Sequence, residues 1–308
     1  MIDNPSSCCR EKRLMKFKQL KIWIEAARPK TLWASFAPVL IGIAMAYSDG
    51  KWDLVIAVLT MFSAVLIQVG TNFANDYFDY FKGADTKERI GPVRATGSGR
   101  VKPETMKIAF LITFALSILF GLYLIGRGGW PILVIGTFSV LFGILYTGGP
   151  FPLGYKGLGD IFVLVFFGPV AVGGTYYLQT LEINYTVILA GLSPGLISTA
   201  LLTVNNLRDI HTDKEAGKRT LAVRFGPIFA RAEYILSMLL ACIMPLILLI
   251  VDPAHPYSLT AILVIVLAGP PVKAVLFDEI SPELNNVLAR TGKILLFYSL
   301  VFSLGWIV

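Results

Sequence analysis

Two short stretches of this sequence place carboxylate and carboxamide side chains directly after long apolar runs. The first follows the apolar run 52–70 and contains Asn72, Asn75, Asp76, Asp79 and Asp85. The second follows another apolar run and contains Asn205, Asn206, Asp209 and Asp213. An ionisable group at the centre of a membrane helix costs ~2.5–3.5 kcal/mol on insertion scales, so such groups at membrane depth indicate a functional site. We therefore interpret the two stretches as two halves of one cation site.

Helical spacing allows these side chains to converge. Residues three or four apart share a helix face, and Asn72, Asp76 and Asp79 have this spacing. Carboxylates that converge on a small volume repel one another unless a cation lies between them. Oxygen ligands of this kind suit Mg²⁺, which keeps several waters and is usually completed by substrate phosphates. The predicted catalytic residues are Asp76, Asp79, Asp209 and Asp213, and the predicted metal ligands are these four with Asp85, Asn72 and Asn206.

Basic residues follow both acidic stretches and extend the prediction to a metal–diphosphate. A diphosphate bound with a metal ion requires carboxylates that hold the metal and neighbouring Lys and Arg side chains that bind the phosphate oxygens. A solvated helix end with excess positive charge explains any single one of these residues, whereas two Asp and Asn clusters on one face favour a site. The predicted binding residues for this substrate are Asn72, Asn75, Arg94, Arg100, Lys102, Lys214 and Lys218.

The elements that position these residues are expected to be membrane helices. The 308 residues are 55% hydrophobic and 15% charged, with a mean hydropathy of +0.69, whereas soluble domains carry about 25% charged residues. The net charge of +7 does not indicate nucleic-acid binding, because the basic residues lie in loops between apolar segments. A helix that spans the bilayer needs about 20 predominantly apolar residues. Nine continuously apolar stretches have roughly this length: 31–48, 52–73, 105–126, 130–147, 158–179, 185–206, 228–251, 258–277 and 288–308.

Charge distribution predicts the orientation of these nine spans. All of the Lys and Arg residues except Lys51 and Arg127 fall on one side of the nine-span arrangement. Because cytoplasmic loops carry the excess of Lys and Arg, we expect a multi-pass plasma-membrane protein with a cytoplasmic N-terminus and an outer C-terminus. Both acidic stretches then lie at the cytoplasmic face. Residues 1–21 are expected to form a basic tail, and residues 22–308 a single transmembrane domain.

Several of these residues also match family motifs. The segments Asn75-Asp76-Tyr77-Phe78-Asp79 and Asp209-Ile210-His211-Thr212-Asp213 resemble the two aspartate-rich motifs of the intramembrane aromatic prenyltransferases, the UbiA superfamily. Stretches 27–32, 91–99 and 146–160 resemble the branch that acts on 1,4-dihydroxy-2-naphthoate in menaquinone synthesis. The resemblance covers residues 22–308. It departs from the first motif at the third aspartate position, which holds Gly83, while Asp85 lies two residues further on.

The resemblance implies a fold and an activity. The expected fold is an all-α bundle of nine transmembrane helices around a central cavity, with the long loops capping its cytoplasmic end. The implied reaction joins the prenyl group of a polyprenyl diphosphate, bound with Mg²⁺, to an aromatic acceptor that then loses its carboxylate to give demethylmenaquinol. For the acceptor, we expect a cation at the rim of the cavity and phenols that position its ring: Arg28, Lys30, Lys156, Tyr146 and Tyr155.

Other functions remain compatible with the sequence. A related enzyme would use another acceptor, such as 4-hydroxybenzoate, homogentisate or haem. A cation-coupled transporter also carries intramembrane Asp and Asn, but its site usually lies near the bilayer midplane on broken helices. Such a transporter would not need the neighbouring Lys and Arg residues. A purely structural membrane protein would leave both acidic clusters unexplained.

Overall fold

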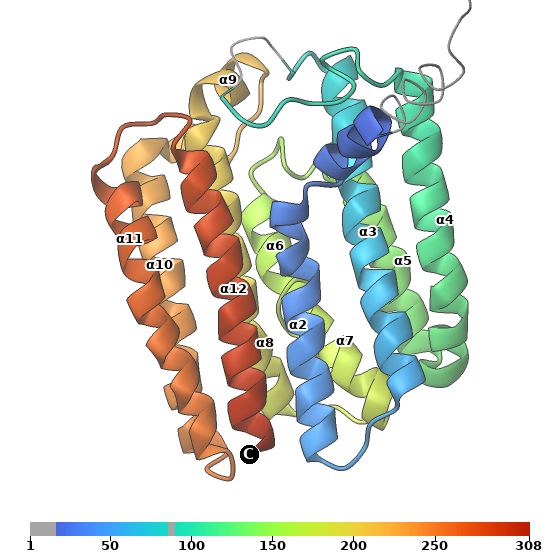
Figure 1. Ribbon diagram of the computed structural model, residues 1–308, viewed down its shortest axis with the longest axis vertical. Helices are drawn as coiled ribbons and strands as arrows, with labels where there is room; N and C mark the ends of the chain where they lie inside the picture. Colours follow the sequence, from blue (N-terminus) through green and yellow to red (C-terminus); the bar gives the residue numbers. More distant parts are fainter. Residues whose placement is uncertain (1–16, 86–89) are drawn as a thin grey trace, which may run out of the picture.

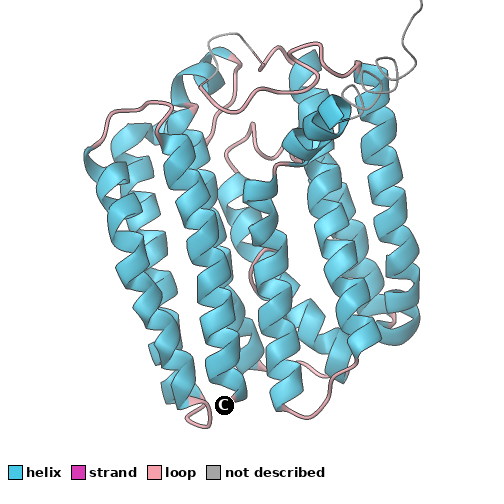
Figure 2. Cartoon of the chain, in the orientation of Figure 1, coloured by secondary structure: helices cyan, strands magenta, loops and turns pink. Residues whose placement is uncertain are grey.

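The computed structural model describes residues 17–85 and 90–308, and within these ranges every regular element is a helix. Residues 17–27 are helical and precede a series of numbered elements. Their bounds are α2 Pro29–Ser48, α3 Leu54–Phe81, α4 Pro103–Gly128, α5 Trp130–Leu145, α6 Gly159–Phe166, α7 Pro169–Thr180, α8 Tyr185–Arg208, α9 Ile210–Glu215, α10 Leu221–Val251, the 3₁₀ helix η1 Pro256–Leu263, α11 Val264–Phe277 and α12 Leu284–Ile307. The prediction of an all-α membrane protein is confirmed (Figure 2).

The expected spans coincide with helices, but not every one meets the length of a simple span. Within the described residues, seven helices are long and apolar enough to cross a membrane, and an eighth span results if η1 and α11 are taken together. The remaining expected span corresponds to α5, which has only 16 residues. The count of nine spans therefore stays a prediction. Most of the expected basic tail, residues 1–16, lies outside the described residues.

The helix that carries the first acidic stretch extends beyond the apolar run. Its start is capped by the Asp53 carboxylate, which accepts a hydrogen bond from the Ile56 N–H, one of the N–H groups without a partner within the helix. No proline or glycine interrupts residues 72–81, so the helix continues to Phe81. The acidic stretch is thus largely helical, and its side chains are held at fixed angles around α3.

The helices form one bundle with its long loops at one end. Helix α8 is the most buried of the candidate spans, and it packs against α10, α12, α6, α7 and α2. Helix α3 packs against α4, α5 and α2. Figure 1 shows α9, the loop between α3 and α4, and helix 17–27 together at the upper end, opposite the C-terminus. Both acidic stretches reach this loop end.

One expected span is broken near its middle. Residues 159–180 form α6 and α7, which are separated by Phe167 and Gly168, and Pro169 is the first residue of α7. Proline lacks a backbone N–H and favours the first turn of a new helix. A Cβ atom on Gly168 would lie 2.4 Å from the Leu164 carbonyl oxygen and 2.7 Å from that of Gly191. The break therefore allows α8 to approach very closely, and only glycine fits there.

Candidate active site

A cavity of about 720 Å³ runs from the loop end deep into the bundle. Its walls come from α2, α3, α4, α5, α6, α7 and α8. Acidic, basic and amide side chains line the loop end, whereas the opposite end is lined by apolar residues such as Leu124, Ile132 and Leu178. The cavity thus provides a polar head and a long apolar extension. The polar lining includes Arg28, Asn72, Asn75, Asp79, Arg94, Asn205, Asn206, Asp209, Asp213 and Lys218.

Asp79 is the point at which the polar contacts of the first motif converge. Its buried carboxylate accepts a hydrogen bond of 2.9 Å from the Tyr155 hydroxyl. The same carboxylate lies 3.4 Å from the Arg94 guanidinium and 3.5 Å from the Lys218 ammonium. Asn75, one turn earlier on the same face, accepts a 2.8 Å hydrogen bond from the Thr147 hydroxyl. These contacts fix both side chains of the first motif that line the cavity.

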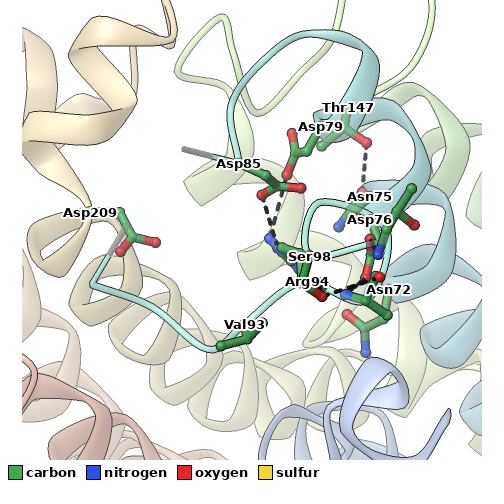
Figure 3. Close-up of polar contacts among 12 residues, drawn as sticks. Asn72, Asn75, Asp76, Asp79, Asp85, Val93, Arg94, Ser98, Thr147 and Asp209 are labelled. Carbon is green, nitrogen blue, oxygen red and sulfur yellow. Dashed lines mark hydrogen bonds and ion pairs between the residues drawn. The ribbon is translucent and has the colours of Figure 1, made fainter. Parts of the chain in front are cut away.

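Asp76 is directed at the loop between α3 and α4, and it does not line the cavity. Its two carboxylate oxygens accept hydrogen bonds of 3.0 Å from the backbone N–H groups of Ala95 and Thr96 (Figure 3). The Ser98 hydroxyl donates to the Arg94 carbonyl oxygen at 2.6 Å, and Gly99 has a φ of +73°, a conformation that glycine adopts without strain. Asp76 therefore anchors the loop that presents Arg94 to the cavity.

Arg94 joins two carboxylates of the first stretch. Its guanidinium lies 3.4 Å from Asp79 and 3.5 Å from Asp85. Figure 3 shows these two aspartates gathered at the Arg94 side chain, with Asp209 on a separate element. A Cβ atom on Gly97 would lie 2.7 Å from the Asp85 Cβ, so glycine there lets the loop pack onto Asp85. Asp85 itself does not line the cavity.

The second motif is held by Arg208, a residue that the sequence reasoning used only in the charge count. Its side chain is 1% exposed. The guanidinium donates to both carboxylate oxygens of the adjacent Asp209, at 2.8 and 2.6 Å. It also donates to the side-chain oxygens of Asn205 at 2.8 Å and Asn285 at 2.9 Å. Since Asn285 belongs to α12, Arg208 fixes the end of α8 to the start of that helix.

Lys218 connects the two motifs. Its ammonium nitrogen lies 3.4 Å from an Asp213 oxygen and 3.5 Å from an Asp79 oxygen. The loop that carries it is tied down by a 2.8 Å hydrogen bond from the Arg219 N–H to the Tyr155 carbonyl oxygen. Positive charge from Lys218 and Arg94 therefore lies among the carboxylates at the polar end of the cavity.

Tyr155 provides an aromatic wall for these cations. Lys82 lies 4.4 Å and Lys218 5.0 Å from the centroid of its ring, within the range of a cation–π interaction. Burial raises the pKa of the Tyr155 phenol well above its ordinary value, and the negative charge of Asp79 raises it further. The phenol thus stays protonated as a donor to Asp79. Burial lowers the pKa of the Lys82 amine, an effect that the Asp79 charge opposes.

Three of the five residues predicted for the acceptor line the cavity: Arg28, Tyr146 and Tyr155. Arg28 has a left-handed backbone, with φ 54° and ψ 68°, and its guanidinium donates to the Asn72 carbonyl oxygen at 3.5 Å. A non-glycine residue in this region costs roughly 1–2 kcal/mol and is often found at functional sites. Tyr155 lines the cavity but donates to Asp79, while Lys30 and Lys156 are exposed outside it.

Comparison with known proteins decides the family. The UbiA prenyltransferase family matches residues 35–301 of the chain. The chain belongs to this family. The 1,4-dihydroxy-2-naphthoate octaprenyltransferase of Haemophilus influenzae is 37% identical over 307 residues, with 97% of this chain and 99% of that protein covered. The enzyme of the same name from Escherichia coli K12 is 39% identical over 299 residues, covering 94% and 96%.

Solved structures agree on the fold of this UbiA family member. A UbiA homologue from Archaeoglobus fulgidus matches with a TM-score of 0.67 and 14% identity, covering 93% of this chain and 99% of that chain. The same homologue bound to DMAPP and Mg²⁺ matches with a TM-score of 0.58 and 15% identity, covering 91% and 99%. At such identities the likeness shows the fold alone. The family resemblance read from the two motifs is confirmed.

Three basic residues predicted for diphosphate lie outside the cavity of this UbiA protein. Arg100 forms a 2.7 Å ion pair with Glu25 and donates to the Val93 carbonyl oxygen at 3.2 Å, so it fastens the loop to helix 17–27. Lys102 is exposed at the start of α4, and Lys214 is exposed on α9. The structure therefore brings together Arg94 and Lys218 from the predicted basic set, and it separates these three from the cavity.

The oxygen donors at the polar end of the cavity have the chemistry that Mg²⁺ prefers. Within the described residues, no group of three or more His, Cys, Asp and Glu side chains is placed to hold a metal by itself. The carboxylates and amides at the polar end are nonetheless hard oxygen donors, the chemistry that Mg²⁺ prefers, and Mg²⁺ is usually completed by waters and substrate phosphates. The side chains that line the cavity and fit this role are Asp79, Asp209, Asp213, Asn75 and Asn206.

Proposed function

We propose that this protein transfers the prenyl group of a polyprenyl diphosphate to 1,4-dihydroxy-2-naphthoate in menaquinone biosynthesis. Two relatives that cover nearly the whole chain, from Haemophilus influenzae and Escherichia coli, carry the name 1,4-dihydroxy-2-naphthoate octaprenyltransferase. The observation that carries the proposal is the cavity itself, whose charged end joins both aspartate motifs and whose remainder is uncharged and mostly apolar. A prenyl diphosphate has the same division into a charged head and an apolar tail.

The charged end of the cavity supports departure of the diphosphate. Negative charge develops on the leaving group, and fixed cations aimed at that charge lower the barrier. Arg94 and Lys218 are the cations that the loops hold beside Asp79. When bound, Mg²⁺ supplies further electrostatic stabilisation of the leaving oxygens. We assign Asp79, Asp209 and Asp213, with Asn75 and Asn206, to this ion, and we assign Asp76 and Asp85 to positioning the loop that carries Arg94.

The acceptor reacts in the space between the charged end and the apolar walls. The bond between the prenyl carbon and the diphosphate oxygen breaks, a carbon–carbon bond to the electron-rich ring forms, and the carboxylate leaves as carbon dioxide. Water must be excluded because it would trap the allylic carbocation. Phe162, Phe166 and Phe167 line this part of the cavity. We assign the acceptor carboxylate to Arg28 and its phenol to Tyr146.

A direct assay tests this function. Purified protein in detergent is incubated with Mg²⁺, octaprenyl diphosphate and 1,4-dihydroxy-2-naphthoate, and the prenylated, decarboxylated product is measured by mass spectrometry. The Asp79→Asn variant serves as the negative control. A product formed with 4-hydroxybenzoate or homogentisate, but none with dihydroxynaphthoate, would move the protein to another acceptor. Cation flux into proteoliposomes without any prenyl transfer would favour a transporter.

A further inference from the structure

A second, smaller cavity lies between α5 and α7. Its volume is about 360 Å³, and nearly all of its walls are apolar. Three of its lining residues, Ile135, Val170 and Gly174, also line the main cavity. One layer of side chains therefore separates the two spaces. The complete lining of this α5–α7 pocket is Pro131, Ile135, Pro169, Val170, Gly173, Gly174, Tyr177, Ile183 and Ile188.

Gly174 is not required by close helix packing. A Cβ atom on Gly174 would lie 3.5 Å from the Ile135 Cδ1, which is an ordinary van der Waals contact. Gly173 fits more tightly, because a Cβ atom there would lie 3.2 Å from the Ile188 Cδ1 and 3.4 Å from the Ile183 Cδ1. At Gly168, by comparison, a Cβ atom would collide with backbone carbonyl oxygens. Glycine inside a helix costs roughly 1 kcal/mol relative to alanine. Gly173 and Gly174 are consecutive inside α7, so the helix carries this cost twice along one wall of the pocket.

The outer side of the α5–α7 pocket faces away from the bundle. Ile183 is 54% exposed and Ile188 is 39% exposed. Ile188 lies on α8, a candidate membrane span, and Ile183 lies in the connection that precedes it. The break between α6 and α7 contributes as well, since Pro169, the first residue of α7, lines the pocket. The pocket is thus an apolar space between the main cavity and the lipid-facing surface.

We propose that the α5–α7 pocket holds the distal units of a long polyprenyl chain, which reach it where the Ile135 side chain turns away from Gly174. The inference rests on the proposed function, because the chain concerned is that of its prenyl donor. Two observations indicate this occupant. The main cavity is charged only at the loop end, and the apolar pocket adjoins its uncharged part. A short prenyl chain ends within the main cavity and does not use the pocket.

The test measures how a wall substitution changes selectivity for prenyl length. Gly173→Leu fills the pocket from α7, and Ile188→Trp fills it independently from α8; neither residue lines the main cavity. For either variant, kcat/KM with octaprenyl diphosphate should fall at least about tenfold, because buried contacts of the distal units are lost. With geranyl diphosphate, kcat/KM should stay within about twofold of the unmodified enzyme. Thermal unfolding in detergent identifies a variant that has lost its fold.

Gly126→Leu is the matched control. Gly126 lies inside α4, has no atom within 4 Å of its ideal Cβ position, and lines neither cavity. The control should retain wild-type rates with both diphosphates. Equal rates for Gly173→Leu and the unmodified enzyme with octaprenyl diphosphate, or equal losses with both donors, would overturn the proposal. If the unmodified enzyme prenylates no acceptor, the proposed function fails instead, and thermal shifts induced by the two diphosphates still compare the binding of long and short chains.

Discussion

The Lys218 ammonium nitrogen lies 3.5 Å from a carboxylate oxygen of Asp79, so a cation that follows the second motif neutralises an anion of the first. The same nitrogen lies 3.4 Å from Asp213. Opposite charges at this separation attract by several kcal/mol at the effective dielectric of a protein surface, about 4 kcal/mol at 4 Å. Lys218 therefore holds the two motifs together, and it lines the polar end of the cavity, where we propose that the diphosphate binds.

Replacement of Lys218 by Met should weaken binding of inorganic diphosphate. A hydrogen bond to a charged group contributes about 1.5–3 kcal/mol, so the dissociation constant in the presence of Mg²⁺ should rise roughly tenfold to hundredfold. Isothermal titration of the purified protein measures this directly. Lys214→Met is the matched control, because Lys214 is exposed on α9 and does not line the cavity. Equal effects of the two substitutions would contradict the assignment.

Replacement of Asp79 and replacement of Asp76 should have different effects on activity and on the loop between α3 and α4. Asp79→Asn removes a buried carboxylate that faces the cavity and pairs with Arg94 and Lys218, so we expect loss of prenyl transfer together with a lower unfolding temperature. Asp76→Asn removes one of the two acceptors for the N–H groups of Ala95 and Thr96. An unsatisfied buried N–H costs about 1–3 kcal/mol, so the loop should become sensitive to proteolysis after Arg94 or Arg100. Limited trypsin digestion distinguishes them; equal resistance of both variants would argue against the anchoring role of Asp76.

Arg208 should be important for stability as well as for the site. Replacement by Met leaves the buried Asp209 carboxylate without its guanidinium, and loss of one partner of a buried pair typically costs about 3–5 kcal/mol. The unfolding temperature in detergent should therefore fall clearly. Lys at this position should recover only part of the loss, since an ammonium cannot donate to both Asp209 oxygens in the same fork. An unchanged unfolding temperature for Arg208→Met would show that the network contributes little.

The sequence was sufficient to predict the helices and the meeting of the two motifs, but not which side of α3 faces the cavity. Asn72, Asp76 and Asp79 follow helical spacing, and so do Asn72, Asn75 and Asp79. Spacing alone cannot choose between two overlapping faces. The choice is made by tertiary contacts, because Thr147 binds Asn75 while the loop after α3 binds Asp76.

The basic residues were harder to assign for a related reason. Excess Lys and Arg at one face is expected for any membrane protein with this orientation, so the pattern does not separate Lys218 from Lys214. Loop conformation separates them. The sequence did contain one indication of the role of Arg208, because this charged residue lies at the end of the apolar run of α8. In the folded bundle its side chain is almost fully buried. That indication was hidden because the residue also fitted the charge count.

Magnesium should bind strongly only together with diphosphate. The carboxylates at the polar end are already paired with Lys218 and Arg94, and no described trio of acidic, His or Cys residues is placed to hold a metal alone. Chelation with EDTA should therefore abolish prenyl transfer without lowering the unfolding temperature. Mg²⁺ or inorganic diphosphate alone should stabilise the protein little, whereas both at 100 times their dissociation constant should add about 2.7 kcal/mol. Thermal unfolding under these four conditions measures the coupling, and Asp79→Asn should lose it. A full stabilisation by Mg²⁺ alone would instead reveal a preformed metal site, and the assignment of Lys218 and Arg94 as resting partners of the carboxylates would then be wrong.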